Sequence, residues 1–322
     1  MSKFLVNLNK FGFAKLDKIF DEKEKKILHK YSTKIFDDEI INYKEAPSTF
    51  INQDVELYYN HKNIFTFFKT TSRNFIGQYE ELDILFSNLF SKNEIKNYFE
   101  AILGNEYKLH TCLMRKADEN SSYMGLHTDN NFAFTISILC NNVDQSHATT
   151  VFVPSSHKFN YDFKNKIEKF NPKFFSFLTK PSEGKVGDIN CFFNKTIHGI
   201  KQSSNKDESS NIIWLLGFHR NSDKLMKTIL LPEHTKYGKK TADVFSEDTL
   251  KLFELNENSR KHSNNFNTKK LIDNINKKNT YSIKQSLILA YLKFIGLNIF
   301  LIRKIIYLLK FKKIVKLNIN SR

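Results

Sequence analysis

The chain has 322 residues, including 31 Phe and 13 Tyr, enough to bury one large core with an appendage or two modest domains. Its N-terminus soon becomes polar, which excludes the apolar core of a secretion signal. Its three scattered cysteines, Cys112, Cys140 and Cys191, form no CxxC pair, so we expect free thiols in a cytoplasmic protein. The net charge is +16, and residues 221–322, with 21 Lys and Arg against 8 Asp and Glu, hold +13 of it.

The N-terminal third predicts a short strand and several helices. A helix is expected after Asp21, where acidic residues precede basic ones, as the helix dipole prefers. Glu80–Leu89 and Lys92–Leu103 have the periodicity of amphipathic helices, and Gly104 ends the second.

From residue 107 to 220 the sequence changes to short apolar segments separated by polar or glycine-containing turns. The expected strands cover residues 107–115, 132–140, 149–154, 188–193 and 211–219. Several short strands with irregular connections predict an antiparallel barrel or jelly roll. Residues 159–180, rich in Phe and Lys, are expected to form a helix or lid.

A histidine and a carboxylate two residues apart, His127 and Asp129, are followed much later by His198. On a strand, residues i and i+2 point to the same side, so both groups of the pair can face one metal ion. If the strand bearing His198 folds over the first, two imidazoles and one carboxylate share one face of the metal. That arrangement is typical of non-haem Fe(II) oxygenases.

Other histidines have simpler interpretations. His110 alternates with apolar residues, which favours a core histidine with its hydrogen bonds satisfied. His219 ends the last expected strand and is a candidate for lining a pocket. His157 is a further candidate metal ligand.

Four ordered blocks surround these ligands, and together they carry a resemblance. They are Gly125–Asp129, Ala148–Lys158, Gly187–Phe193 and the pair His198–Gly199. The chain resembles the phytanoyl-CoA dioxygenase-like family of Fe(II)/2-oxoglutarate oxygenases, which has a strand-borne HxD, a stretch like VPGSHK, then GD, an apolar strand and HG. Leu8–Phe13 also looks like the start of that family's domain, so the resemblance covers residues 8 to about 220. The resemblance implies that His157 lies in a structural turn and is not a metal ligand.

The resemblance implies an α+β fold with a mainly β core, a double-stranded β-helix (jelly roll) with flanking N-terminal helices and a helical C-terminal extension. It assigns residues 1–220 to the oxygenase domain, with the jelly-roll core at about 105–220. It implies that His127, Asp129 and His198 bind Fe(II), with 2-oxoglutarate as cosubstrate and dioxygen as oxidant. The expected reaction is hydroxylation of an unactivated C–H bond in a small-molecule or lipid-like substrate.

The sequence departs from the family at the residue that anchors 2-oxoglutarate. Relatives place an Arg about ten residues beyond the distal histidine, where it pairs with the far carboxylate of the cosubstrate. Here residues 206–211 contain no Arg. Lys206 and Arg220 are therefore the candidates for cosubstrate binding, and Arg115 with Lys116 offers a third route.

The C-terminal region divides into a polar linker or helical region, residues 221–280, and a basic, apolar helical tail, residues 281–322. Ser286–Ile302 is almost continuously apolar, Lys293 interrupts it, and basic residues follow. Such a helix suits peripheral contact of residues 281–317 with a membrane, and packing on the barrel or on a second subunit is the equal alternative. Nucleic acid is not an expected partner, because the segment is apolar and carries no recognised module.

Two alternative functions remain open at this point. The first is a non-catalytic jelly-roll protein that docks on a membrane or partner through its basic tail, which the missing anchor Arg favours. The second is a zinc hydrolase that uses the same trio of ligands. Iron content and consumption of 2-oxoglutarate distinguish the three hypotheses.

Overall fold

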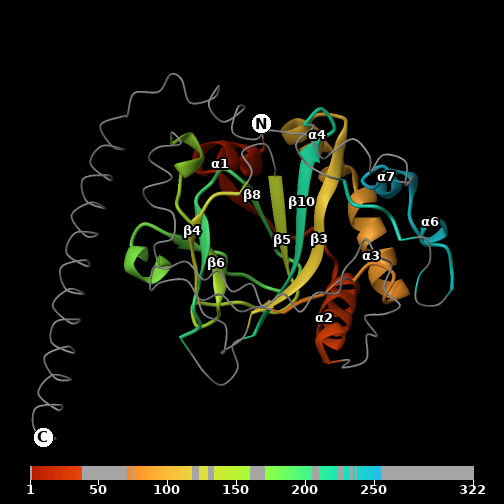
Figure 1. Ribbon diagram of the computed structural model, residues 1–322, viewed down its shortest axis with the longest axis horizontal. Coiled ribbons are helices and arrows are strands. Elements are labelled where there is room, and N and C mark those ends of the chain that lie inside the picture. Colours follow the sequence, from red (N-terminus) through yellow and green to blue (C-terminus); the bar gives the residue numbers. More distant parts are fainter. Residues whose placement is uncertain are drawn as a thin grey trace, which may run out of the picture.

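The structure, a computed structural model, describes residues 2–37, 71–73, 75–117, 123–129, 134–159, 171–204, 210–223, 228–232, 235 and 238–254. Within them, two antiparallel sheets pack together, and helices cover the outer side of the larger sheet (Figure 1). This is an α+β arrangement with a jelly-roll core, and it confirms the predicted fold class.

The larger sheet has six strands in the order β1-β8-β5-β10-β3-β2. Their bounds are β1 Phe13–Leu16, β8 Ile189–Phe193, β5 Phe134–Leu139, β10 Asn211–Arg220, β3 Tyr107–Ala117 and β2 Thr71–Arg73. The smaller sheet has the order β4-β9-β6-β7. Its strands are β4 Met124–His127, β9 His198–Lys201, β6 Thr149–Phe152 and β7 Lys180–Pro181.

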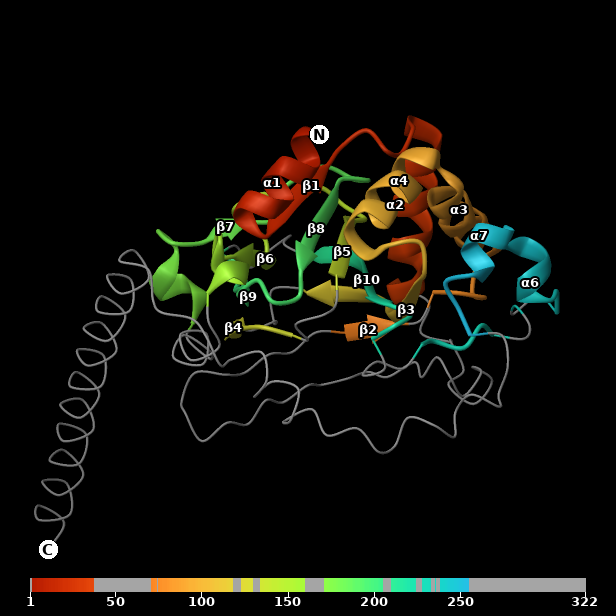
Figure 2. The same ribbon diagram turned by 90° about the horizontal axis from the view of Figure 1, so that it is seen from above.

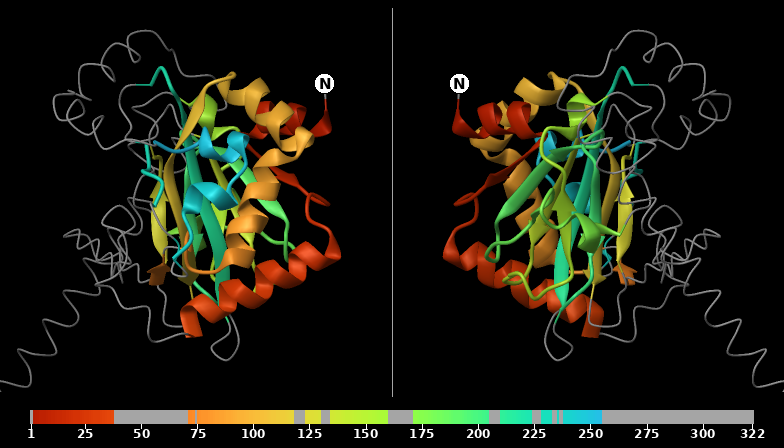
Figure 3. Two further views of the ribbon diagram at one scale, coloured as in Figure 1. Left: turned by 90° about the vertical axis from the view of Figure 1, so that its right-hand side faces the viewer. Right: turned by 90° about the vertical axis from the view of Figure 1, so that its left-hand side faces the viewer.

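The helices of the first third lie together beside the larger sheet (Figures 2 and 3). They are α1 Lys3–Phe11, α2 Glu22–Asp37, α3 Glu80–Ser91 and α4 Asn93–Leu103. Two short 3₁₀ turns, η1 Ser156–Lys158 and η2 Pro172–Phe175, follow strand β6. The helices expected at 80–89 and 92–103 are confirmed to within two residues.

Strand β10 separates the helical layer from the space between the sheets. Trp214 stacks on Phe75 with ring centroids 4.5 Å apart, and Phe218 meets Phe99 edge-on at 4.7 Å. All four rings are fully buried, so this side of the strand anchors the sheet to the helices. Because side chains alternate along a strand, the other residues of β10 face the smaller sheet.

Residues 241–254 are part of the core. The sequence predicts a polar linker or helical region from residue 221, but α6 Thr241–Val244 and α7 Glu247–Leu250 pack on α3. Phe245 and Phe253 are buried in the main hydrophobic cluster, within 5.8 and 6.1 Å of the Phe86 ring. The few apolar residues of this segment therefore close the helical layer.

Several expectations lie outside the described residues. These are the basic tail at 281–322, Lys206 and most of the expected lid at 159–180. Among the helices that the structure describes, none combines the length and apolar character needed to cross a bilayer. The three cysteines are free and buried, in agreement with the sequence expectation.

Gly12 joins the N-terminal helix to the loop that precedes His198. It ends α1 in the left-handed conformation with φ +85°, and its carbonyl accepts hydrogen bonds from the Phe193 amide and the Thr196 hydroxyl at 3.0 and 2.8 Å. A Cβ at this position would lie 2.5 Å from both His157 Nδ1 and Thr196 Oγ1. Only glycine fits both the backbone and the space.

We predict that Gly12→Ala lowers the free energy of unfolding by about 2 kcal/mol or more, because it adds backbone strain to a steric clash. Gly238→Ala is the matched control: its φ is also positive, at +78°, but nothing lies within 4 Å of an added Cβ. That control should cost only about 1 kcal/mol. Urea unfolding measures both values, and equal losses would contradict the steric argument.

Candidate metal centre

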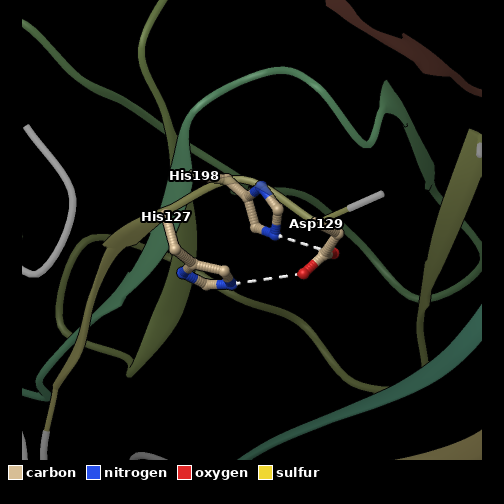
Figure 4. Close-up of side chains that lie close together, drawn as sticks. All are labelled: His127, Asp129 and His198. Atoms are coloured by element: carbon tan, nitrogen blue, oxygen red, sulfur yellow. Dashed lines mark ion pairs between the residues drawn. The ribbon is translucent and has the colours of Figure 1, made fainter. Parts of the chain in front are cut away.

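Three side chains, His127, Asp129 and His198, converge at the edge of the smaller sheet (Figure 4). Their candidate ligand atoms all lie within 4.8 Å of one another. His127 Nε2 is 3.6 Å from one carboxylate oxygen of Asp129, and His198 Nε2 is 3.3 Å from the other. The two imidazole rings have centroids 4.4 Å apart. The sequence thus correctly identified the three residues that meet.

Pairing between strands β4 and β9 brings the two imidazoles together. His127 ends β4 and is the register partner of His198, which begins β9. Asp129 lies just beyond β4 rather than on it, and its backbone amide donates to the Asn194 carbonyl at 3.0 Å. His127 and Asp129 therefore face the same point, as the i, i+2 spacing predicts. Asp129 does not lie on the strand, however, and its carboxylate is oriented by a loop that is hydrogen-bonded to Asn194, next to β8 of the larger sheet.

Backbone carbonyls fix the orientation of both imidazoles. His127 Nδ1 lies 2.8 Å from the Gly125 carbonyl, and His198 Nδ1 lies 2.9 Å from the Thr196 carbonyl. A carbonyl can only accept, so in each ring Nδ1 donates a proton and Nε2 keeps its lone pair. Metal-ligating histidines are commonly held in this way by the second nitrogen.

The donor set fits a divalent transition metal. Each Nε2 atom lies within 3.6 Å of a carboxylate oxygen of Asp129, so the two imidazoles and the carboxylate could share one metal ion. Two imidazoles and one carboxylate on one face leave the remaining coordination positions open.

The electrostatics of the cluster favour a cation. Burial, together with the neighbouring His198, lowers the pKa of His127 to about 4. Burial also acts against the charge of Asp129, but His198, His127 and Arg115 outweigh it and hold the pKa of Asp129 below its usual range. Burial lowers the pKa of His198, yet Asp129 overcomes this and raises it above its ordinary value. Asp129 therefore stays a carboxylate at neutral pH, and its negative charge attracts a cation to the two imidazoles.

A cavity of about 330 Å³ lies between the two sheets and opens onto the three ligands. Ligand sites commonly measure about 300–1,000 Å³, so it can hold small molecules. Its polar lining beyond the ligands consists of His110, Thr111, Arg115, Thr135, Thr150 and Asn194. Its apolar lining consists of Met124, Phe192, Ile200, Ile213 and Leu215.

Of the other three histidines discussed above, two have structural positions and one lines the cavity. His157 lies in the turn η1 with its Nε2 bonded to the Asn9 carbonyl at 3.0 Å, as the structural interpretation predicts. His219 is outside the cavity lining and is bonded to the Arg220 carbonyl and the Thr228 hydroxyl. His110 differs from the expectation of a satisfied core residue, because it lines the cavity and its buried Nε2 has no hydrogen-bond partner among the described residues.

The candidate anchors for a cosubstrate lie in different places. Arg220, the last residue of β10, is exposed, and its backbone amide donates to Asp223 at 3.1 Å. It is not part of the cavity lining, and Lys206 lies outside the described residues. Arg115 is the one cationic side chain in that lining, as far as the structure describes it, and its charge acts on all three ligands.

The fold and the side-chain cluster define a jelly-roll protein with a candidate metal centre of two histidines and one carboxylate. The fold is similar to that of EctD from S. alaskensis with bound Fe, at 13% sequence identity over 71% of this chain and 80% of that chain, with a TM-score of 0.50. This likeness agrees with the fold that the sequence resemblance implies.

Two further solved structures match this chain with TM-scores just below 0.5. HygX from Streptomyces hygroscopicus with nickel and 2-oxoglutarate bound has 11% identity, 69% and 88% coverage of the two chains, and a TM-score of 0.49. SnoN, a non-heme alpha ketoglutarate dependent epimerase from nogalamycin biosynthesis, has 12% identity, 68% and 80% coverage, and a TM-score of 0.47. No protein-family model and no curated protein matches the sequence.

We predict that His127→Ala, Asp129→Ala and His198→Ala each abolish stoichiometric Fe(II) binding, because each removes one of three ligands. Anaerobic titration followed by metal analysis measures the stoichiometry. His147→Ala is the matched control, because His147 also pairs with a carboxylate, Asp144 at 2.9 Å, but that pair has no third ligand within reach among the described residues. Full iron loading of all three ligand variants would exclude this site. If the wild-type protein instead retains zinc in preference to iron, the zinc hydrolase hypothesis would be favoured.

Proposed function

We propose that this protein is a non-haem Fe(II)- and 2-oxoglutarate-dependent oxygenase that hydroxylates an unactivated C–H bond of a small molecule. The observation that carries the proposal is the cluster of His127, Asp129 and His198 on a jelly-roll core, with both Nε2 atoms turned toward the carboxylate. The EctD structure, which has bound Fe on a similar fold, supports iron as the metal.

Iron with 2-oxoglutarate and dioxygen would supply the oxidising power that an unactivated C–H bond requires. The chain contributes position and shielding. The fixed Nδ1 donors hold both imidazoles in one orientation, which limits the reorganisation needed on binding. The apolar residues Phe192, Ile213 and Leu215 line the same cavity and keep part of it free of water.

We further propose that Arg115 anchors the far carboxylate of 2-oxoglutarate. It lies on β3, directly opposite Ile213 of β10 in the sheet register. The family's Arg enters from the strand that follows the distal histidine, which is β10 here, and Ile213 on that strand also lines the cavity. A guanidinium on the neighbouring strand can serve the same space and match a carboxylate with two hydrogen bonds.

An anaerobic titration of 2-oxoglutarate into Fe(II)-loaded protein tests the function directly. We expect a visible charge-transfer band that saturates with added 2-oxoglutarate and is absent from His198→Ala. Wild-type protein with dioxygen should then form succinate. Protein that binds iron but gives neither the band nor succinate would contradict the proposal and favour the non-catalytic alternative.

We predict that Arg115→Gln weakens 2-oxoglutarate binding by about 10- to 100-fold, the size expected for a hydrogen bond to a charged group, while iron binding persists. Arg220→Gln and Lys206→Gln are the comparison variants, because both residues remain candidates from sequence. Calorimetric titration of the three variants decides between them. A loss in Arg220→Gln or Lys206→Gln, with Arg115→Gln unchanged, would overturn the assignment of Arg115.

A further inference from the structure

A β-bulge in the larger sheet turns His110 into the cavity. Gly217 of β10 pairs with Thr111 of β3, and the next residue, Phe218, pairs with Leu109. His110 therefore has no register partner, and two residues of β3 oppose one of β10. Such bulges redirect a side chain. In a regular strand His110 and Thr111 would point to opposite faces, but here both line the cavity.

Gly217 provides the space that the His110 ring occupies. A Cβ on Gly217 would lie 2.5 Å from both Cε1 and Nε2 of His110. The imidazole thus lies across the backbone of β10, where any other residue would displace it. The β-bulge directs the His110 side chain toward the cavity, and Gly217 leaves the space that its ring occupies.

The His110 ring is held at one nitrogen, while the other nitrogen is buried beside Gly217 without a hydrogen-bond partner among the described residues. The held nitrogen is Nδ1, which lies 2.9 Å from the Thr111 hydroxyl, and the buried one is Nε2. Burial lowers the pKa of His110 to about 4, with repulsion from His219 adding to the effect, so the ring is neutral near pH 7. A buried polar atom without a partner is costly, and a ligand in the cavity would satisfy it.

Neither the metal nor the proposed cosubstrate anchor accounts for this nitrogen. His110 does not belong to the cluster whose ligand atoms lie within 4.8 Å of one another. Arg115 lies five residues further along β3, about 16 Å at the rise of a strand, so the two side chains serve different ends of the cavity. His110 is therefore a candidate for contact with the primary substrate.

The end of the cavity around His110 is polar and uncharged. Thr135 pairs with Gly217 from the other side and donates to the Asn194 side-chain oxygen at 2.6 Å. The Asn194 carbonyl in turn accepts from the amide of Asp129, so this polar end adjoins a proposed metal ligand. A hydroxyl group, which both donates and accepts, complements a neutral imidazole in either tautomer.

We propose that His110, held across Gly217 by the β-bulge, binds a hydroxyl group of the primary substrate and positions a small, uncharged, hydroxyl-bearing molecule beside Asp129. This assignment rests on the proposed oxygenase function for the role of Asp129. It narrows the substrate class from small molecules in general to alcohols. His110 acts as a positioning and specificity residue.

The test compares two probes of similar shape, cyclohexanol and methylcyclohexane, in ligand-observed NMR titrations of metal-free wild-type protein and His110→Phe. Phenylalanine keeps a ring at this position and removes both nitrogens. We expect wild-type protein to favour cyclohexanol, and His110→Phe to weaken cyclohexanol binding by about three- to tenfold, the size of one neutral hydrogen bond. Methylcyclohexane binding should not change.

Two further variants separate His110 from general cavity polarity. Gly217→Ala, which displaces the ring, should reproduce the loss seen in His110→Phe. Thr150→Val removes a hydroxyl from the opposite sheet and should leave cyclohexanol binding unchanged. Equal losses in Thr150→Val and His110→Phe, or none in His110→Phe, would overturn the proposal.

Parallel titrations with Fe(II) and 2-oxoglutarate keep the two proposals distinguishable. Both should bind His110→Phe as they bind wild type, which also establishes that the variant is folded. A matching loss of 2-oxoglutarate affinity would assign His110 to the cosubstrate and overturn the inference. If wild-type protein binds no 2-oxoglutarate, the proposed function fails, whereas the metal-free probe comparison still decides whether His110 binds a hydroxyl.

Discussion

The pairing of His127 with His198 across β4 and β9 is the contact on which the rest of the site depends. It brings two imidazoles side by side at the edge of the smaller sheet, and backbone carbonyls then set the direction of each ring. A slip of one residue in this register would turn one imidazole to the other face of the sheet. Gly12, which binds the Thr196 hydroxyl through its carbonyl, links the N-terminal helix to the loop that fixes this register.

Strand β10 connects the stability of the molecule to the shape of the cavity. Trp214 and Phe218 fasten one face of it to the helices, so its position is set by a large aromatic core. Ile213, Leu215 and Gly217 on the other face line the cavity. Because the helical layer fixes the backbone, small changes on the cavity face can alter ligand binding without loss of the core, and Gly217→Ala makes use of this separation.

The sequence predicts well those features that local pattern encodes. Alternating short strands indicate the jelly roll, and the His127–Asp129 pair with His198 indicates a metal cluster. It does not reveal the role of His110, because a histidine among apolar residues suggests burial in a regular strand, and the bulge arises only from pairing with the distant β10. The packing of residues 241–254 on the helical layer could not be predicted either, because the few apolar side chains in this polar segment show no helical or strand periodicity.

The charges of the loaded site indicate which kind of substrate completes it. In the proposed loaded site, a divalent metal and Arg115 would supply three positive charges, and Asp129 with a dicarboxylate cosubstrate would supply three negative charges, so these four groups would balance. A further unpaired charge there would bear a large desolvation cost. Neutral polar groups such as His110, Thr111 and Thr135 then remain to recognise the last ligand. Electrostatic balance in the proposed loaded site favours an uncharged molecule, and the unpartnered nitrogen of His110 favours one that bears a hydroxyl group.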